Sequence, residues 1–270
     1  MHRRLERSVV LAATVGAIGI LSGVVISVQA QGGQQAPPPA RTLVTTTMVK
    51  PDMVTAYSEL IQKEAIPAYK KAGIPFRWVF ANGPVGPGAT FVSAQPIRNY
   101  ADFDQGPVLR AAMGPDIYAK YLARLRPMLL STHGVIQTLV ANASIQSFSG
   151  KPPAWVIVAT TQLLPGRGAE YASITTNEFL PAFKKAGVTD SWMFAANFGA
   201  PVTQRTIVTP IAGWADLDQP GALARALGPE AAQKLNQKRA SLTTSTESVV
   251  MRYVPELSYG TPTRPAGTAQ

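Results

Sequence analysis

Two stretches of this sequence decide its fold: EAIPAYKKAGIPFRWVF at residues 64–80 and EFLPAFKKAGVTDSWMF at residues 178–194. Both carry a proline, then the block KKAG, then a Trp-x-Phe triplet, and they lie 114 residues apart. The same offset aligns about residues 41–140 with 155–254 without a gap, which predicts two copies of one structural unit. Further matched pairs include Pro51 with Pro165, Tyr57 with Tyr171, Pro96-Ile97 with Pro210-Ile211, and Gly114-Pro115 with Gly228-Pro229.

Within each copy, the spacing of apolar residues predicts strand, helix, strand, strand, helix, strand. Lys70 and Lys71 fall in the last turn of the first helix, where cations face the carbonyl end of the dipole, and Gly73 suits a left-handed cap. Pro67 and Pro181 lie inside this helix and are expected to kink or split it, since proline removes a hydrogen-bond donor. In the first copy we expect strands at residues 43–50, 76–80, 90–97 and 135–140, and helices at residues 54–72 and 115–130.

The amino terminus has the composition of an export signal. Three arginines among the first seven residues precede an almost uninterrupted apolar run over residues 9–28, and the small residues that follow match a cleavage site. We therefore expect residues 1–30 to be a signal peptide and the protein to be periplasmic or secreted. The run is also long enough to span a bilayer, so an uncleaved anchor is the alternative.

The rest of the chain divides by composition into a linker, two repeats and a tail. Residues 31–41 are rich in glutamine, glycine and proline and are expected to tether the fold without a function of their own. The first repeat is expected at residues 42–148, the second at residues 152–258, and a flexible tail at residues 259–270. The chain has no cysteine, which excludes disulfides, thiol chemistry and cysteine metal ligands.

The net charge is strongly positive: +10 for the whole chain, and +8 once residues 1–30, with three arginines and one glutamate, are removed. Such an excess favours anionic ligands or a lipid surface. Because the basic residues are dispersed rather than gathered with aromatic residues in one stripe, we expect no nucleic-acid partner. Membrane contact is expected only through the amino-terminal segment or weakly through a basic helix face, which otherwise is an ordinary solvated surface. That face consists of Lys120, Arg124 and Arg126 and, in the second copy, Lys234, Lys238 and Arg239.

Two further features complete the layout: an aromatic second strand at Trp78 and Trp192, and a segment Tyr/Trp-Ala-Asp-Phe/Leu-Asp at residues 100–104 and 214–218. With these features the chain resembles the dimeric α+β barrel superfamily, which includes antibiotic-biosynthesis monooxygenases, EthD-like proteins and NIPSNAP-like proteins. The resemblance covers nearly all of residues 41–256. It implies an α+β fold of two tandem ferredoxin-like βαββαβ repeats, packed as an intramolecular pseudo-dimeric α+β barrel.

The resemblance also has implications for cofactors and ligands. Members that bind haem usually use a histidine ligand, and the mature chain offers only His133, whose partner in the second copy is Glu247. A haem site is therefore not supported, and we expect no cofactor. The cofactor-independent oxygenases of the group bind a polycyclic or aromatic substrate between sheet and helices, which is the enzymatic activity closest to this sequence.

His133, Glu247 and Arg252 are the candidate catalytic residues. His133 and Glu247 occupy matching positions but differ in chemistry, so together they could accept and donate a proton in one asymmetric pocket. Arg252, opposite Thr138 in the repeat, could offer a cation to an anionic substrate. The alternative for all three residues is a solvent-exposed position on a strand.

Trp78, Phe80, Trp192 and Phe194 are the candidate ligand-binding residues, because small-molecule sites are mainly apolar. Trp78 and Phe80 alternate along one strand, as do Trp192 and Phe194, so each pair shares one face of its strand. Their presence in both copies favours the alternative, that they pack the core common to both copies.

Asp102 with Asp104, and Asp216 with Asp218, form an Asp-x-Asp pattern that could bind a hard cation. Two carboxylates are a thin ligand set, so we expect no metal site and assign Asp104 and Asp218 to helix caps. The chain has no glycine-rich phosphate loop, no serine nucleophile elbow and no His-Glu-x-x-His zinc motif. Nucleotide hydrolysis, serine hydrolysis and zinc proteolysis are thereby disfavoured.

Two functions remain open. The first is an exported protein that binds an apolar or aromatic small molecule and acts on it as a cofactor-independent monooxygenase or isomerase. The second is a non-catalytic binding or structural module of the cell envelope. We expect an enzyme to depend on His133, and a module to depend on its basic surface at Lys234, Lys238 and Arg239.

Overall fold

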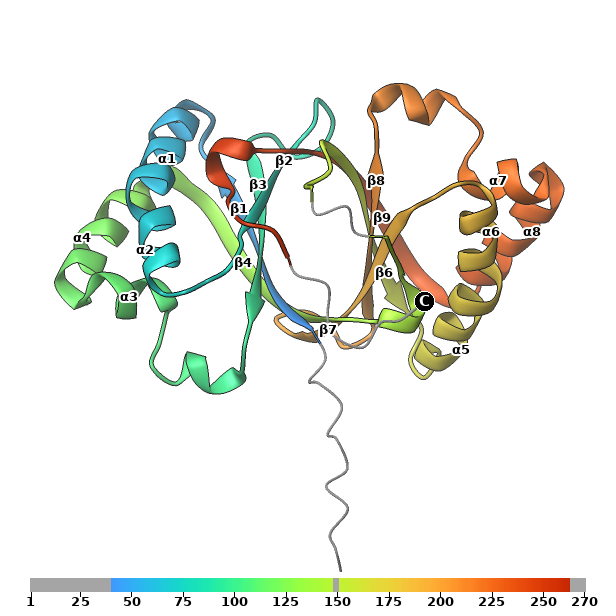
Figure 1. The fold of residues 1–270 in the computed structure, drawn as a ribbon, viewed down its shortest axis with the longest axis horizontal. Coiled ribbons are helices and arrows are strands. Elements are labelled where there is room, and N and C mark those ends of the chain that lie inside the picture. The colour runs from blue at the N-terminus through green and yellow to red at the C-terminus, as the bar shows by residue number, and fades with distance from the viewer. Residues whose placement is uncertain (1–39, 148–150, 263–270) are drawn as a thin grey trace, which may run out of the picture. The chain divides into compact units, whose positions relative to one another are not determined.

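The computed structural model describes residues 40–147, here called the first half, and residues 151–262, the second half. Nine strands form one antiparallel sheet with helices on its outer side (Figure 1). The predicted signal peptide, most of the expected linker and the end of the expected tail lie outside the described residues. The strands are β1 Arg41–Val49, β2 Trp78–Asn82, β3 Thr90–Ile97, β4 Leu129–Leu139, β5 Ile145–Gln146, β6 Trp155–Leu163, β7 Asp190–Phe198, β8 Gln204–Ile211 and β9 Thr243–Tyr253.

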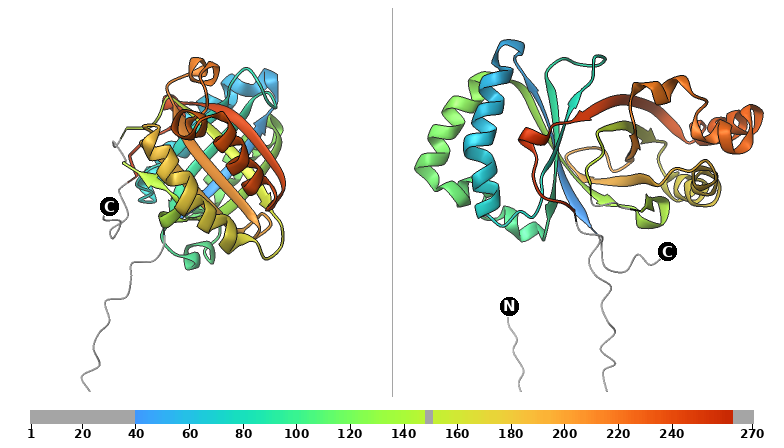
Figure 2. Two further views of the ribbon diagram at one scale, coloured as in Figure 1. Left: turned by 90° about the vertical axis from the view of Figure 1, so that its right-hand side faces the viewer. Right: turned by 45° about the horizontal axis from the view of Figure 1, so that its top comes forward.

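The sheet closes on itself into a barrel. Its order is β4-β1-β3-β2-β9-β6-β8-β7-β5, and a further pairing of β4 with β7 joins the two ends of the row of eight long strands. The two halves thus meet along two seams, where Phe80 of β2 lies opposite Tyr253 of β9 and Thr138 of β4 lies opposite Ala195 of β7. Figure 2 shows the helices of each half on opposite sides of the barrel.

The prediction of two tandem ferredoxin-like repeats packed as a pseudo-dimer was wrong. The strands form a single hydrogen-bonded barrel, and the described residues fall into one compact unit. The physical reason lies in the strand edges: β2, β4, β7 and β9 would otherwise expose unpaired backbone groups, and pairing across the halves satisfies them. The alternation of residues in a strand shows which face of the strand is apolar. It does not show which other strand will pair with it.

The helices cover the outside of the barrel. A π-helical turn at Ile61–Ala65 joins α1 to α2, and another at Thr175–Phe179 joins α5 to α6. The predicted interruption of the helix at Pro67 and Pro181 is therefore confirmed. A proline lacks a backbone N–H and its ring crowds the preceding turn, and the wider π-helical turn accommodates it. Within the described ranges, no helix is long and apolar enough to cross a bilayer. The α-helices are α1 Val54–Leu60, α2 Ile66–Lys71, α3 Val108–Met113, α4 Pro115–Leu125, α5 Gly168–Ile174, α6 Leu180–Lys185, α7 Ala222–Leu227 and α8 Pro229–Ala240.

Element boundaries follow the sequence pattern in part: the last strand of the first half begins at Leu129 rather than residue 135, and α3 was not expected. The third strand, expected at residues 90–97, is confirmed as β3. The second helix of the first half was expected to reach residue 130, but α4 ends at Leu125 and β4 already begins at Leu129. Pro127 explains the difference, because a proline cannot continue the hydrogen bonding of an α-helix. Short 3₁₀ turns lie at Pro51–Met53, Tyr100–Phe103, Arg126–Met128, Ala141–Ala143, Trp214–Asp218 and Pro255–Leu257.

Three apolar clusters stabilise the molecule. One lies between the first-half strands and their helices and includes Tyr57 and Val79, and a similar cluster in the second half includes Met193. The third cluster contains Trp78 and Phe80. Because Val79 stands between these two residues and faces the helices, its neighbours face the interior of the barrel.

Candidate functional site

The three candidate catalytic residues are not brought together. His133 lies in β4 and Glu247 in β9, both are exposed, and within the described part of the chain no hydrogen bond or ion pair joins them. Arg252 follows Met251, whose buried side chain lies inside the barrel, so Arg252 points to the outer face and is exposed there. None of the three lines the cavity described below.

The four aromatic candidates lie on the inner face of the barrel. Trp78 and Phe80 are buried, and Trp192 and Phe194 are half-buried. The ring centroids of Trp78 and Phe80 are 6.5 Å apart, and the Phe80 ring lies 5.6 Å from that of Tyr253, both edge to face. Such packing is typical of a core.

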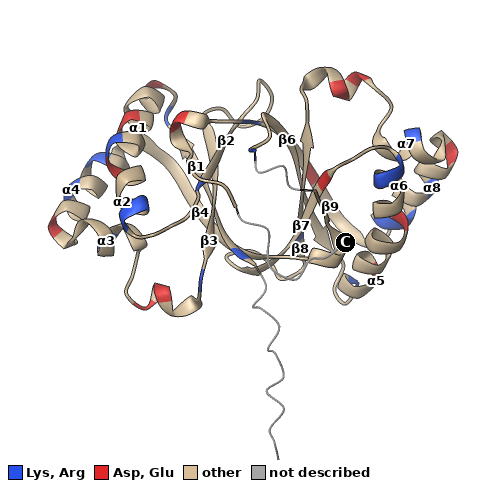
Figure 3. Cartoon of the chain, in the orientation of Figure 1, with Lys and Arg blue, Asp and Glu red and all other residues tan. Residues whose placement is uncertain are grey.

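The basic helix face is partly engaged in ion pairs. Arg124 on α4 pairs with Glu64 in the first π-helical turn, and Lys238 on α8 pairs with Glu178 in the second. Figure 3 shows charged residues of both signs on these outer helices. Because the pairs are exposed, each stabilises the contact between its helices only weakly.

The assignment of Asp104 and Asp218 to helix caps was wrong. In the first half Asn99 is the cap, since its side-chain oxygen accepts a hydrogen bond of 3.0 Å from the backbone N–H of Asp102. In the second half Asp216 accepts a bond of 2.7 Å from a backbone N–H four residues earlier. Over the described ranges, no group of three or more histidine, cysteine or acidic residues could hold a metal ion.

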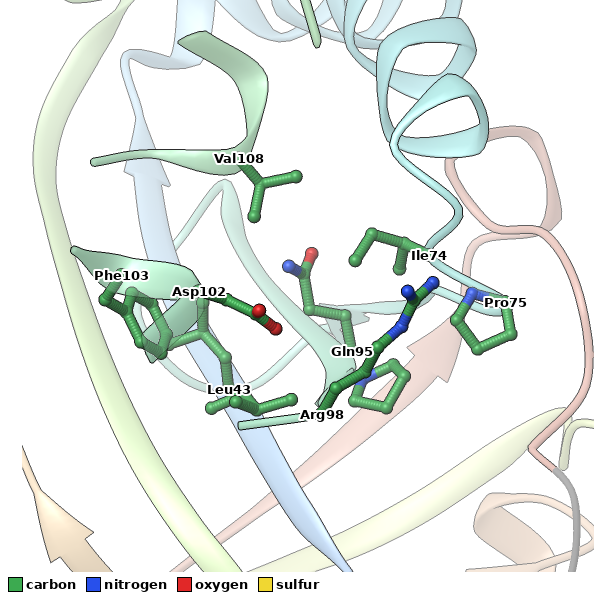
Figure 4. A pocket seen from close by; sticks show the side chains of 10 residues that line it. Leu43, Ile74, Pro75, Gln95, Arg98, Asp102, Phe103 and Val108 are labelled. Atoms are coloured by element: carbon green, nitrogen blue, oxygen red, sulfur yellow. The ribbon is translucent and has the colours of Figure 1, made fainter. Parts of the chain in front are cut away.

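A small cavity opens between the first-half sheet and its helices (Figure 4). Leu43 from β1, Ile74 from the loop after α2, Phe103 from the segment before α3 and Val108 at the start of α3 supply its apolar walls. The space open to the centres of water molecules is about 30 Å³, which holds a few waters at most. An aromatic ligand therefore needs the walls to move apart.

Polar groups converge on this cavity from the end of β3. The Gln95 amide points into it (Figure 4), is only 6% exposed, and has no hydrogen-bond partner among the described residues. The Asp102 carboxylate faces the same space. Arg98 reaches across and donates a hydrogen bond to the carbonyl of Gly73, which ties β3 to the loop after α2.

Arg77 precedes β2 and, by strand alternation, faces the same side of the sheet as Gln95. The pairing of β2 with β3 begins at Trp78 opposite Ala94, and continuing it by one residue on each strand leads to Arg77 and Gln95. Arg77 is 7% exposed, so its charge is buried between the sheet and the helices. It was not among the residues singled out from the sequence.

The guanidinium of Arg77 is incompletely satisfied. One nitrogen donates to the carbonyl of Leu257 at 3.3 Å, and the group lies over the Tyr69 ring at 5.3 Å from the centroid. Its Nε is buried without a hydrogen-bond partner. In the described residues no carboxylate forms an ion pair with it.

Tyrosines surround this cation. Tyr57 and Tyr121 are buried in the same cluster, and Tyr118 stacks on Tyr121 with ring centroids 6.3 Å apart. Burial raises the pKa of both Tyr57 and Tyr121, and the nearby charge of Arg77 lowers it by a smaller amount. Both hydroxyls therefore remain protonated at neutral pH.

The second half lacks this polar cluster. Ser191 stands where the first half has Arg77, and its hydroxyl lies 3.3 Å from that of Thr209, the counterpart of Gln95. Phe183 and Leu235 replace Tyr69 and Tyr121. The difference between aligned copies was visible in the sequence: a position that carries Arg in one copy and Ser in the other could have marked Arg77.

The carboxyl-terminal end of the second half covers this site. We call residues 255–260 the C-terminal strap. Tyr259 and Arg77 exchange two backbone hydrogen bonds of 2.9 Å, and the backbone N–H of Val79 donates to Ser258 Oγ at 2.9 Å. Trp78 Nε1 donates to the carbonyl of Gly260 at 3.0 Å, so the strap is anchored along the edge of β2.

No protein-family model and no curated protein matches the sequence. Solved structures do resemble the fold. A protein from Lactobacillus acidophilus NCFM named "putative monooxygenase" is 8% identical with a TM-score of 0.52, and the match covers 83% of this chain and 98% of that chain. An "anthrone oxidase-like protein" is 10% identical with a TM-score of 0.59, covering 86% and 97%. A mutant chlorite dismutase from Candidatus Nitrospira defluvii is 10% identical with a TM-score of 0.50, covering 81% and 92%.

These neighbours are members of the dimeric α+β barrel superfamily. The resemblance inferred from the sequence is thus confirmed at the level of the fold that these neighbours share. At identities of about a tenth, the likeness concerns the fold and not the activity. The tandem duplication stays a prediction.

Proposed function

We propose that this chain binds an apolar or aromatic small molecule in the first-half cavity and oxygenates it without a bound cofactor. The observation that carries the proposal is the buried Gln95 amide, which points into a mainly apolar cavity and has no protein partner within the described residues. Apolar walls with a few convergent polar groups are the usual composition of a small-molecule site.

The cavity has movable walls that suit such a ligand. One wall is the loop between α2 and β2, which contains Ile74, and another is the segment between β3 and α3. The hydrogen bond from Arg98 to Gly73 holds the first of these loops against β3. A ligand that separates the two walls gains contact with Gln95 in return.

The names of the structural neighbours support oxygenation. One is an anthrone oxidase-like protein, and proteins from Lactobacillus acidophilus NCFM and Fusobacterium nucleatum are named as monooxygenases. The matches cover at least 92% of each of these chains, so the comparison involves whole domains rather than a shared fragment. We transfer the activity to this chain as part of the proposal.

Anthrone is a suitable probe for the reaction. Loss of a proton from its methylene carbon gives an enolate, which reacts with dioxygen to form a C–O bond. The O–O bond then breaks and water leaves, so anthrone and dioxygen yield anthraquinone and water. The substrate supplies all four electrons. Gln95 would donate a hydrogen bond to the enolate oxygen, which stabilises the negative charge as it develops.

Replacement of Gln95 tests the proposal. In Gln95→Leu, dioxygen uptake with anthrone should fall at least about tenfold, since a hydrogen bond to a charged oxygen contributes about 1.5–3 kcal/mol. An oxygen electrode and the absorbance of anthraquinone measure the rate. Thr209→Val, the matching change in the second half, is the control and should keep the full rate. A wild-type rate equal to the uncatalysed rate, or no difference between wild type and Gln95→Leu, would contradict the proposal.

We also infer that the two halves arose by duplication and that the site developed in one of them. β1 and β6, β3 and β8, and β4 and β9 each begin and end at positions 114 residues apart, which supports the inference. The pair of variants at Gln95 and Thr209 tests the asymmetry, because two equivalent sites would make both variants lose activity.

A further inference from the structure

Arg77 is a buried cation without a counter-ion. Only 7% of the residue is exposed. The protein offers it the carbonyl of Leu257 and the face of the Tyr69 ring, while Nε has no partner and no described carboxylate pairs with it. Buried charges are normally paired, because taking a charge out of water is costly.

The groups around Arg77 suit a negatively charged oxygen. Tyr57 and Tyr121 are neutral, buried phenols, and the hydroxyl of Tyr57 is hydrogen-bonded to Thr47. Continuing the pairing of β2 with β3 one residue beyond Trp78 and Ala94 leads to Arg77 and Gln95. A cation together with neutral donors matches an anionic acceptor. The charge of Arg77 disfavours a cationic ligand beside it.

The arrangement is specific to the first half. The second half has Ser191 in place of Arg77, and its hydroxyl is within hydrogen-bond distance of Thr209. Phe183 and Leu235 replace the tyrosines at positions 69 and 121. A purely structural need of the fold for an arginine at this position would apply to both halves, so the cation meets a requirement that only the first half has.

We propose that the ligand of the first-half site carries an ionised oxygen, a carboxylate, phenolate or enolate on an apolar body, and that Arg77 pairs with this oxygen. The inference rests on the proposed function, since it names the class of molecule that the first-half cavity takes. Gln95 links the two parts of the site: it lines the cavity, and the pairing of β2 with β3, continued one residue beyond Trp78 and Ala94, leads from it to Arg77. The apolar body occupies the widened cavity, and the charged end reaches Arg77.

Two probes of equal shape separate charge from apolar binding. 2-Naphthoate is an anion at pH 8, and 2-naphthamide is its neutral counterpart. Isothermal titration of the full chain should give at least about tenfold tighter binding of 2-naphthoate. In Arg77→Met, the affinity for 2-naphthoate should fall at least about tenfold, while that for 2-naphthamide should stay within about threefold.

Two further variants control for charge and folding. Arg77→Lys keeps the cation and should retain part of the preference for 2-naphthoate. Arg205→Met removes a partly buried arginine of the second half, whose guanidinium is held by the carbonyls of Val202 and Gln204, and should change neither affinity. Arg77→Met should fold and unfold at least as cooperatively as the wild type, because it removes an unpaired buried charge.

The outcomes distinguish the two proposals. If the wild type binds both probes equally and Arg77→Met binds them as the wild type does, the anionic ligand class is wrong while the apolar site stands. If the wild type binds neither probe, the site itself is wrong and the inference falls with it. If Arg77→Met does not fold, Arg77 is a structural residue and the inference is overturned.

Discussion

Single buried polar residues distinguish two halves that otherwise share their layout. Arg77 and Gln95 are less than a tenth exposed. Arg77 Nε is buried without a hydrogen-bond partner, although such groups are usually paired. Their counterparts, Ser191 and Thr209, lie within hydrogen-bond distance of each other. At this scale the first-half pair keeps an unpaired buried donor, whereas the two hydroxyls of the second-half pair are close enough to bond to each other.

The buried tyrosines make the stability of the protein depend on alkaline pH. Burial raises the pKa of Tyr121 above its usual value of about 10. Above pH 10 the unfolded chain therefore loses this proton while the folded chain keeps it, so the unfolded state binds fewer protons and is favoured. We expect the free energy of unfolding to fall as the pH rises from about 10 to 11.5, and to fall less steeply in Tyr121→Phe.

Urea denaturation at a series of pH values measures this slope. Lysines and the other tyrosines titrate in both proteins, so the difference in the free energy of unfolding between variant and wild type at each pH reports Tyr121 alone. Parallel curves for wild type and Tyr121→Phe would show that the Tyr121 hydroxyl ionises as readily in the folded protein as in the unfolded chain.

Short segments that leave the last strand of each half bind the opposite half. The backbone N–H of Val79 donates to Ser258 Oγ, and that of Met193 donates to Ser144 Oγ, both at 2.9 Å. The segment of the first half forms β5 beside β7, whereas the C-terminal strap makes one bridge with Arg77. At the scale of elements, each half contributes a segment that packs on the strands of the other half. The C-terminal strap is the segment that lies beside the buried Arg77.

The loop between α2 and β2 is held by a contact that only the first half has. Arg98 donates to the carbonyl of Gly73, and Ala212 occupies the matching position of the second half. In Arg98→Ala we expect backbone amides of residues 72–76 to exchange hydrogen faster, because the loop loses its bond to β3. Hydrogen exchange measured by mass spectrometry tests this, with residues 186–190 as the internal control. Unchanged exchange at residues 72–76 would mean that the bond does not hold this cavity wall.

The barrel unites the two halves along both seams. Beyond the strand pairings, Tyr100 of the first half packs edge to face on Phe198 of the second at 5.5 Å. Trp214 of the second half packs against Gly83 of the first. At the scale of the whole molecule, each half contributes an aromatic residue that closes on a hairpin of the other, so neither half is expected to fold independently.

Closure of the barrel depends on a glycine after β7. Gly199 has a φ of +83°, and a Cβ at this position would lie 2.1 Å from the carbonyl oxygen of Gly134 in β4. Gly187 has a similar φ of +81° but open space around it. We expect Gly199→Ala to lower the free energy of unfolding by at least about 2 kcal/mol more than Gly187→Ala, since both pay for backbone strain but only the first forces β4 and β7 apart.

Chemical denaturation of the two variants and the wild type measures this difference. Equal losses in Gly199→Ala and Gly187→Ala would show that the seam between β4 and β7 adjusts without cost. A larger loss in Gly187→Ala would contradict the importance of this seam for stability.

The sequence by itself determined the strands, the helices, their broken first member and the resemblance to the dimeric α+β barrel superfamily. These features follow from local sequence patterns, namely the alternation of apolar residues, their helical spacing, and the prolines at positions 67 and 181. Each pattern acts on residues close together in the chain, so it can be recognised from the sequence alone. Only the tertiary structure decided that the strands close into one barrel, because an unpaired strand edge does not specify its partner. It also decided that Arg77 and Gln95 are buried in the first half, while His133 and Arg252 are exposed on different strands. Such a site depends on which face each residue takes and on the burial of its charge, and both are set by contacts between distant parts of the chain.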